Sequence, residues 1–193
     1  MDSYALYGGG ARAAQGRRCA NFARVELEEA IRTRRTHKAY GSEPLSRKDL
    51  ETLLDLARWA PNHNLTQPWR FRVLGPGALA RLKAAAEPDA AAKLARAPTL
   101  VVASARLGGD PVEDEEDLHA AACAVYAVLL GAHARGFAGY WRTPEVLRTA
   151  AGREAVELEE NERVLGLIHL GPPREEKQPP ERRSLEHYVT FLP

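Results

Sequence analysis

Arg34, Arg35 and Thr36 form the segment of this sequence best suited to bind an anion. A guanidinium group holds phosphate oxygens through paired, charge-assisted hydrogen bonds, and the neighbouring hydroxyl adds a further donor. Each such bond contributes about 1.5–3 kcal/mol. The alternative is that both arginines only balance the negative C-terminal end of a helix dipole. The segment therefore predicts a phosphate site, with a helix-end role as the competing interpretation.

The loop at residues 60–69, Ala-Pro-Asn-His-Asn-Leu-Thr-Gln-Pro-Trp, is the second polar segment. Its prolines restrict the chain, which lowers the entropic cost of holding the side chains between them in place. Asn62 and His63, with Asn64 and Gln67, offer donors and acceptors that suit a planar ring carrying several carbonyl groups and nitrogens. The alternative is ordinary turn chemistry, in which asparagine is common. We favour ligand binding.

Trp141, Arg142 and Thr143 are a third candidate segment. Thr143 followed by Pro144 predicts a helix N-cap and a first-turn proline, opening a helix that extends to Ala151. Arg142 would then place its charge beside a helix end that already attracts anions. The alternative assigns Trp141 to the core and Thr143 to capping alone.

The elements that position these segments follow from hydrophobic spacing and capping signals. A helix over 26–35 carries the arginines, and a second helix opens at Ser46 with Asp49 completing a capping-box pattern. Pro61 ends that second helix. Residues 69–74 alternate as a half-buried strand, and Gly75-Pro76-Gly77 predicts a turn after it.

The middle of the chain predicts two alanine-rich helical segments, at 78–86 and 89–96, and a buried strand at 99–103. An acidic loop at 110–114 leads into a long helix at 115–134. Because that helix is apolar nearly all round, we expect it at the centre of the fold.

The last third predicts strands at 137–141 and 164–170, an exposed charged connector at 174–186, and renewed strand character at 187–192. A terminal strand after such a connector can reach a neighbouring subunit. Interleaved helices with few, short strands indicate an α+β fold, in which helices layer a mixed, mainly antiparallel central sheet. No strand is followed by the glycine pattern of a Rossmann dinucleotide site.

Length and composition are those of one globular domain. The chain has 193 residues, of which 45% are hydrophobic and 27% charged, and 27 basic against 26 acidic residues give a net charge of +1. This balance argues against nucleic acid or a membrane surface as the partner. We expect a flexible leader at 1–24, with four arginines, and a folded domain at 25–193. A leader that docks nucleic acid or a partner remains a minor alternative.

Cys19 and Cys123 stand in unrelated contexts, which argues against a disulfide and for a reducing cytoplasm. No apolar run resembles a secretory signal, and the apolar stretch 120–132 is too short to span a bilayer. His119 and Cys123 share a helix face, but no second pair stands at ligand spacing. We therefore expect no metal site.

Four segments in order resemble the nitroreductase-like family of FMN-dependent oxidoreductases, and its compact bacterial subgroup in particular. The resemblance covers residues 26–193. The matching segments are the helix ending in Arg34-Arg35-Thr36, the loop Ala-Pro-Asn-His-Asn-x-x-Gln-Pro-Trp, Gly136-Phe137-x-Gly139-x-Trp141-Arg142-Thr143 and Val164-x-Gly166-x-x-x-Leu170-Gly171.

The resemblance implies an α+β homodimer that holds FMN at the subunit interface. One chain would grip the phosphate and ring edge, while Asn62 and His63 of the other reach the flavin. Hydride would come from NADH or NADPH and leave to a nitroaromatic or quinone-type acceptor in a ping-pong cycle, so no catalytic acid or base is assigned. The residues implied to bind the cofactor are Arg34, Arg35, Thr36, Asn62, His63, Trp141, Arg142 and Thr143.

Two departures from the larger family members leave the chemistry partly open. Thr36 stands where serine is commoner, which keeps the hydroxyl, and the helical excursion that covers the active site in larger members is absent. Substrate size is therefore undetermined. Dehydrogenation of a biosynthetic intermediate, or breakdown of flavin itself, remains an alternative on the same scaffold.

Overall fold

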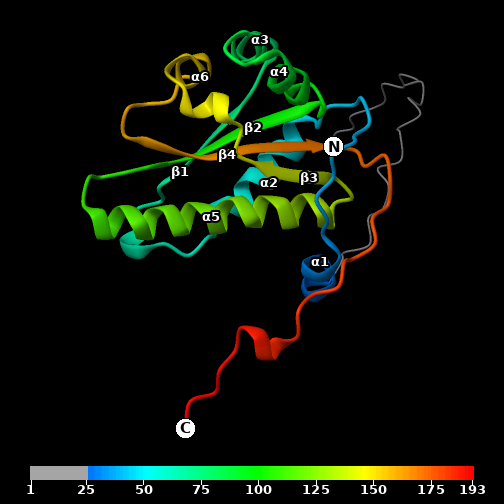
Figure 1. Cartoon of the computed structure of the whole chain (residues 1–193), viewed down its shortest axis with the longest axis vertical. Coiled ribbons are helices and arrows are strands. Elements are labelled where there is room, and N and C mark those ends of the chain that lie inside the picture. The colour runs from blue at the N-terminus through cyan, green and yellow to red at the C-terminus, as the bar shows by residue number, and fades with distance from the viewer. Residues whose placement is uncertain (1–25) are drawn as a thin grey trace, which may run out of the picture.

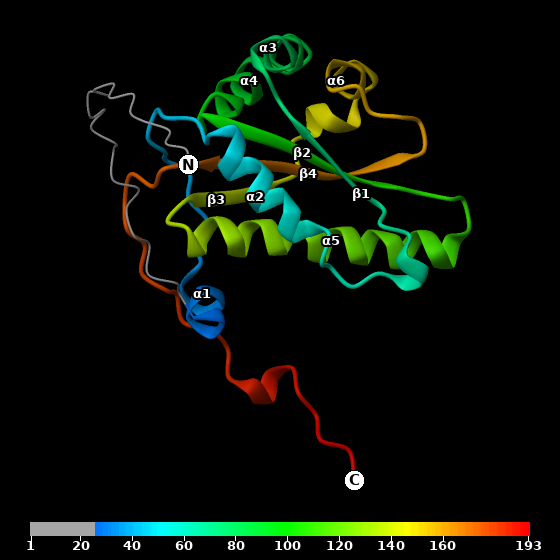
Figure 2. The same ribbon diagram turned by 180° about the vertical axis from the view of Figure 1, so that it is seen from behind.

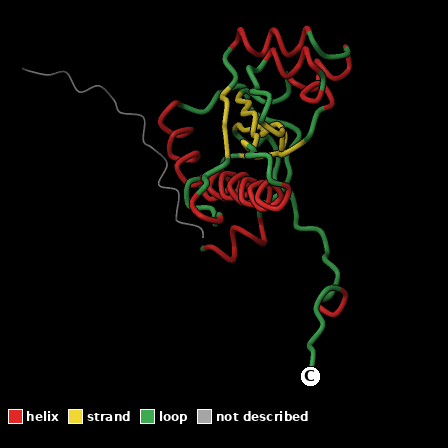
Figure 3. Tube along the Cα trace, turned by 90° about the vertical axis from the view of Figure 1, so that its left-hand side faces the viewer, coloured by secondary structure: helices red, strands yellow, loops and turns green. Residues whose placement is uncertain are grey.

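A four-stranded antiparallel sheet lies between two layers of helices in the computed structural model, which describes residues 26–193 (Figures 1 and 3). The predicted leader at 1–24 lies outside the described residues. The strand order is β1-β2-β4-β3. The strands are β1 (Trp69–Val73), β2 (Thr99–Arg106), β3 (Ala138–Arg142) and β4 (Glu162–Gly171). The layered α+β architecture predicted from the sequence is confirmed.

One face of the sheet is covered by α5 (Pro111–Ala134), with α2 (Arg47–Ala57) packed against it (Figure 2). Ser46 caps α2 as predicted, since its hydroxyl accepts a hydrogen bond from the Asp49 N–H at 3.1 Å. The core on this side includes the fully buried Leu53, Val101, Val125, Val128, Ile168 and Leu170.

The other face is covered by shorter helices. They are α3 (Pro76–Ala84), α4 (Pro88–Leu94), the 3-10 helix η2 (Glu145–Arg148) and α6 (Ala150–Ala155). They bury a second cluster that includes Leu82, Leu94, Leu100, Val102, Leu147 and Leu167. Both sheet faces are thus closed by apolar side chains, and the open surfaces lie along α5 and at the sheet edges.

Three helices begin earlier than the sequence predicted, in each case at a proline: α4 by one residue, at Pro88, and α3 and α5 by two or more. The expected turn at Gly75-Pro76-Gly77 is the first turn of α3, with Gly75 as the N-cap. The expected acidic loop at 110–114 is the start of α5, because Asp110 accepts hydrogen bonds from the N–H groups of Val112 and Glu113. Proline has no N–H to lose at a first helical position, so it favours these starts.

The predicted helix from Thr143 to Ala151 is wrong. Pro144 precedes η2, and Thr149 caps a separate helix, α6, by accepting a hydrogen bond from the Gly152 N–H at 3.1 Å. Thr143 is exposed and caps no helix. Thr143 and Thr149 are both possible N-caps in the sequence. Gly152 of α6 lies against Val146, where a side chain would clash, and this packing favours Thr149 as the cap.

The C-terminal residues leave the globular body. Residues 187–192 form no strand within this chain; η3 (Leu185–His187) is a single 3-10 turn, and the segment runs past α1 (Leu27–Thr33) and away from the sheet (Figures 1 and 3). The strand predicted there would need a partner outside the single chain.

Helix α5 is the one helix among residues 26–193 that is long and apolar enough to cross a membrane by length and composition. Its apolar residues include fully buried side chains that pack on the sheet, such as Val125 and Val128. The opposite side, which includes Cys123 and Tyr126, is exposed. The prediction of a central helix therefore holds for one side of α5 only.

Candidate functional site

Arg34, Arg35 and Thr36 lie where α1 ends and the chain turns along the sheet edge. The Arg34 N–H closes the helix by donating to the Ala30 carbonyl at 3.0 Å. The chain is then extended, so Thr36 forms a parallel bridge with Gly139 of β3. The predicted phosphate segment is therefore attached to β3, whose far end carries Arg142.

The two arginines have different environments. Arg35 donates from Nη1 to the Arg34 carbonyl at 2.6 Å and from Nη2 to the Arg32 carbonyl, so most of its guanidinium caps the end of α1. Its buried Nε has no partner within residues 26–193. The half-buried Arg34 guanidinium makes no hydrogen bond or ion pair with that part of the chain. Arg35 thus fits the helix-end interpretation, and Arg34 is the cation available to an anion.

His133, in the last turn of α5, stands beside this cationic segment. Thr33 Oγ1 donates to the Glu29 carbonyl at 2.6 Å, and the same oxygen lies 2.8 Å from His133 Nε2. Because the hydroxyl has one proton, the imidazole must donate from Nε2, which fixes its tautomer. Burial, then the positive charge of Arg34, lowers the pKa of His133, so the ring is neutral near pH 7.

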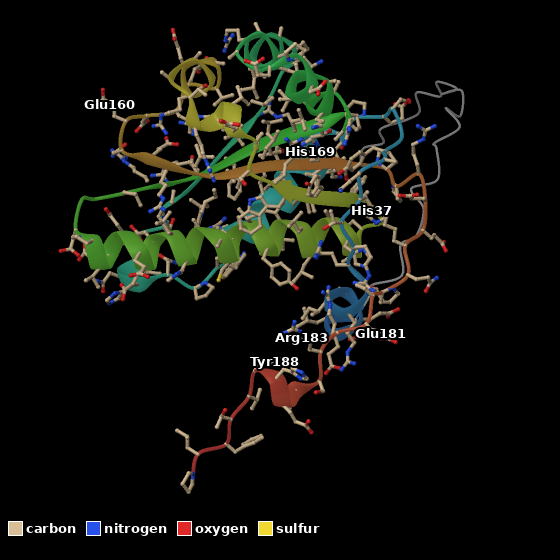
Figure 4. The ribbon with its side chains drawn as sticks, viewed as in Figure 1. His37, Glu160, His169, Glu181, Arg183 and Tyr188 are labelled. Carbon is tan, nitrogen blue, oxygen red and sulfur yellow. The ribbon has the colours of Figure 1, made fainter. Side chains whose placement is uncertain are left out.

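A cleft of about 270 Å³ adjoins this end of α5 and includes Arg35, His37, His133 and Lys177 in its lining. His37 is buried, and its Nδ1 has no partner among the described residues (Figure 4). Burial, followed by the charge of Lys177, lowers its pKa. Lys177 donates to the Thr36 carbonyl at 3.3 Å and forms an ion pair with Glu175 at 3.2 Å, a charge pair that the sequence analysis missed. Lys177 lies in a charged connector, where the sequence gives no sign that a lysine contacts the candidate site.

Trp141 is a structural residue. Its indole Nε1 donates to the Leu165 carbonyl at 3.0 Å and packs over Gly166, where an added Cβ would lie 2.6 Å from that nitrogen. This contact joins β3 to a bulge in β4, and a contact of Trp141 with the cofactor stays a prediction. Thr143 is exposed, beyond the end of β3.

Arg142 is half-buried and pairs with no carboxylate of the described chain. On the same sheet face, His169 is 1% exposed, with both ring nitrogens unpartnered within residues 26–193. Burial, followed by the charges of Arg142 and Arg96, lowers the pKa of His169 to about 4. The imidazole is therefore neutral, packed 5.6 Å from the Tyr140 ring (Figure 4).

The loop after α2 is held by its own side chains. Asn62 Oδ1 accepts from the Gln67 N–H at 3.0 Å, while its Nδ2 donates to the Ala60 carbonyl at 3.1 Å. Between them Asn64 and Leu65 have φ values of 48° and 54°, and Gln67 has 47°. Left-handed backbone at residues other than glycine costs about 1–3 kcal/mol each and clusters at functional sites. Both polar atoms of the Asn62 side chain therefore form hydrogen bonds that stabilise the shape of the loop.

His63 points from this loop to the start of α5. Its Nδ1 lies 2.6 Å from Glu116 Oε2, and the neighbouring Thr66 hydroxyl donates to Asp117 at 2.6 Å. The hydrogen bond to Glu116, then the charges of Glu116 and Glu113, raise the pKa of His63. The imidazole is 61% exposed, so Nε2 remains available to a ligand.

Within one chain the two predicted half-sites lie at opposite ends of α5. His63 contacts Glu116 and Thr33 contacts His133, 17 residues apart. At a rise of about 1.5 Å per residue this is about 25 Å along the helix. Between the ends, the outer side of α5 opens onto an apolar groove of about 470 Å³, lined among others by Leu27, Leu56, Trp59, Tyr126, Ala127 and Leu130.

Comparison with known proteins agrees with this fold. The family model "Nitroreductase family" matches residues 31–172. A Haemophilus influenzae protein with the name "Putative NAD(P)H nitroreductase" is 30% identical over 181 residues, covering 84% of this chain and 97% of its own length. The chain belongs to the nitroreductase family.

Two further relatives extend the comparison. The "Putative NAD(P)H nitroreductase YdjA" of Escherichia coli K12 is 28% identical over 164 residues, covering 78% of this chain and 90% of its own. A nitroreductase structure from Desulfovibrio desulfuricans in complex with FMN superposes with a TM-score of 0.73 at 24% identity, covering 89% of this chain and 99% of that one. This last similarity establishes the fold.

Proposed function

We propose that this protein is a cytoplasmic, FMN-dependent oxidoreductase that takes electrons from NADH or NADPH and passes them to nitroaromatic or quinone-type acceptors. The observation that carries the proposal is the half-buried Arg34 guanidinium, which pairs with no carboxylate of residues 26–193 and whose charge acts on His37 and His133 in the lining of the cleft. A guanidinium without a protein partner suits a phosphate, whose oxygens it can hold through paired hydrogen bonds. Membership of the nitroreductase family, and the FMN in the name of a structural neighbour, support flavin mononucleotide as the ligand.

Two copies of the chain would build each site. A two-fold axis across the middle of α5 brings the start of one α5 near the end of the other. The loop bearing Asn62 and His63 would then meet the partner's cationic segment, and the apolar groove along α5 would be covered. In this arrangement Arg34, Thr36 and Arg142 bind the phosphate side, while the loop of the second chain orients the ring.

FMN, when bound, supplies reversible two-electron transfer, and the chain supplies binding, orientation and electrostatics. The site needs no general acid or base for that transfer. A ping-pong cycle follows if donor and acceptor occupy the same position beside the ring in turn. The missing helical excursion leaves that position open to acceptors of different size.

The C-terminal arm supports the two-chain site. Leu185, Tyr188, Phe191 and Leu192 are between 55% and 86% exposed on a segment that projects from the body (Figures 1 and 4). Covering these large apolar side chains by a second copy would lower the free energy, because their surface would be removed from water. Removing residues 184–193 should weaken the dimer, as measured by analytical ultracentrifugation; an unchanged dissociation constant would contradict this role.

The cofactor is tested by the visible spectrum of the purified protein and by the nucleotide released on denaturation. Flavin absorption with FMN in the supernatant, together with NADH or NADPH oxidation that depends on a nitroarene or quinone, is expected. A colourless protein that binds no added FMN would refute the proposal. Flavin binding without nicotinamide oxidation would favour the other flavin chemistries.

Mixed dimers test whether the site is shared. Arg34→Ala and Asn62→Ala chains should each bind FMN poorly as homodimers. When they are unfolded together and refolded, each mixed dimer has one site with both defects and one with none, so about half of the flavin capacity should return in that species. If each chain builds its own site, mixing restores nothing.

A further inference from the structure

The contact between His63 and Glu116 joins the 60–69 loop to α5 by a side chain that the loop's shape does not require. Thr66 and Asp117 already tie the loop to the same helix at 2.6 Å, and Asn62 closes it internally. His63 instead remains 61% exposed, and its Nδ1 is committed to Glu116 Oε2 at 2.6 Å. A carboxylate accepts, so Nδ1 donates and Nε2 faces outward.

The charges around His63 are all of one sign. Glu116 and Glu113, both on α5, act on the imidazole, and no cation of the described chain appears among the charges that shift its pKa. A protonated ring in this place has an N–H at Nε2 as well as at Nδ1. A neutral ring held in the same tautomer would present a lone pair there, which repels the carbonyl oxygens and other acceptors of a flavin ring.

We propose that Glu116 is a positioning residue that keeps His63 cationic, so that the loop presents an Nε2–H donor to the FMN bound by the partner chain. This inference rests on the proposed function. It assigns Glu116, which has no place in the motifs read from the sequence, the task of setting the charge and direction of His63. The affinity for FMN then depends on the protonation of His63 as well as on the arginines at the other end of α5.

The sign of the pH dependence follows from this contact. Because Glu116 raises the pKa of His63, the cation persists above the ordinary pKa of about 6.5. Affinity for FMN should hold through that pH and weaken as pH rises through the raised value. The phosphate of FMN titrates with a pKa of about 6, so each variant is compared with the wild type at the same pH.

Three variants separate charge from structure. Glu116→Gln keeps a hydrogen-bond acceptor but removes the charge, and should move the loss of FMN affinity to lower pH, giving about a three- to fivefold higher Kd at pH 7.5. Thr66→Val cuts the neighbouring tie to α5 and should leave the pH profile of FMN affinity unchanged. His63→Gln should abolish this part of the pH dependence.

A nuclear magnetic resonance titration of His63 supplies a readout that needs no FMN. Glu116→Gln should lower the His63 pKa in the apoprotein, whereas Thr66→Val should not. In the wild type, adding FMN should raise the His63 pKa by the logarithm of the ratio of the high-pH to the low-pH Kd, since binding and protonation are linked.

Three results would overturn the inference. They are an unchanged His63 pKa in Glu116→Gln, the same pH profile of affinity in His63→Gln and the wild type, or equal effects of Glu116→Gln and Thr66→Val. Failure of the wild type to bind FMN at any pH would refute the proposed function instead. The titration of the apoprotein would still decide whether Glu116 sets the charge of His63.

Discussion

The two ends of α5 place histidines in opposite electrostatic environments. At its start, Glu116 and Glu113 raise the pKa of His63; at its end, burial and Arg34 lower the pKa of His133. The helix dipole favours Glu113 and Glu116 at the start and Arg34 near the end, and these neighbours, together with burial at the end, set the two opposite pKa shifts. The same residue type therefore favours its protonated form at one end and its neutral form at the other.

The two ends also differ in how complete they are. Around the 60–69 loop the polar atoms of Asn62 and Thr66 are paired within the chain, and left-handed backbone is held in place. Around α1 the Arg34 guanidinium, Arg35 Nε and His37 Nδ1 have no partners in the described part of the chain. One end is shaped before a ligand arrives, while the other offers donors that a ligand must satisfy.

The largest expected effect concerns His169, which is buried in β4. Its pKa of about 4 lies below the ordinary 6.5, so the unfolded chain binds a proton that the folded chain does not. Stability should therefore fall as pH drops from about 6.5 to 4, by roughly 3 kcal/mol.

Urea unfolding across this pH range tests the role of His169, with His169→Phe as the control. The variant should lose much less stability on acidification. Glu162 also loses stabilisation in acid, but only as pH falls through a pKa held below its usual 4.5, where burial is outweighed by hydrogen bonds from Arg72 and Ser104. Parallel curves for both proteins would show that folding leaves the pKa of His169 unchanged.

The second expected effect separates the paired arginines. Arg34→Ala should raise the Kd for FMN about 10- to 100-fold, because it removes an unpaired cation, with little change in the free energy of unfolding. Arg35→Ala removes hydrogen bonds to the carbonyls of Arg34 and Arg32, so it should cost about 1 kcal/mol of stability and less affinity.

Fluorescence titration with FMN and urea unfolding measure both quantities for each arginine variant. If Arg35→Ala weakens binding as much as Arg34→Ala does, the assignment of Arg35 to the helix end is wrong.

The third expected effect concerns the 60–69 loop, which is shaped before a ligand binds. Asn62→Ala removes the acceptor for the Gln67 N–H and frees a loop that holds left-handed residues. We expect FMN affinity to fall by about 1–2 kcal/mol, chiefly through lost ordering of the loop. Amide hydrogen exchange of residues 60–69 should accelerate in the same variant, and unchanged exchange would mean that Asn62 contacts the ligand directly.

Local signals made the fold and the position of most candidate residues predictable from sequence. Apolar spacing located the strands and α2, and the guanidinium pair and the polar loop were recognised from residue types alone. What each side chain does depended on contacts remote in sequence, such as Trp141 with Leu165. Glu116 and Lys177 were missed because a carboxylate in an acidic helix turn and a lysine in a charged connector look like solvated surface.

The smallest expected effect tests where the phosphate lies relative to His133. Thr33→Val removes the acceptor for His133 Nε2–H and should lower the free energy of unfolding by less than about 1 kcal/mol, with FMN affinity nearly unchanged. A phosphate near Arg34 adds negative charge close to the imidazole, so FMN should raise the His133 pKa in an NMR titration of the wild type. The His63 pKa should rise in the same complex. A shift of the His63 pKa without one of the His133 pKa would show that the phosphate does not bind near the end of α5. The assignment of the phosphate to Arg34 would then be wrong.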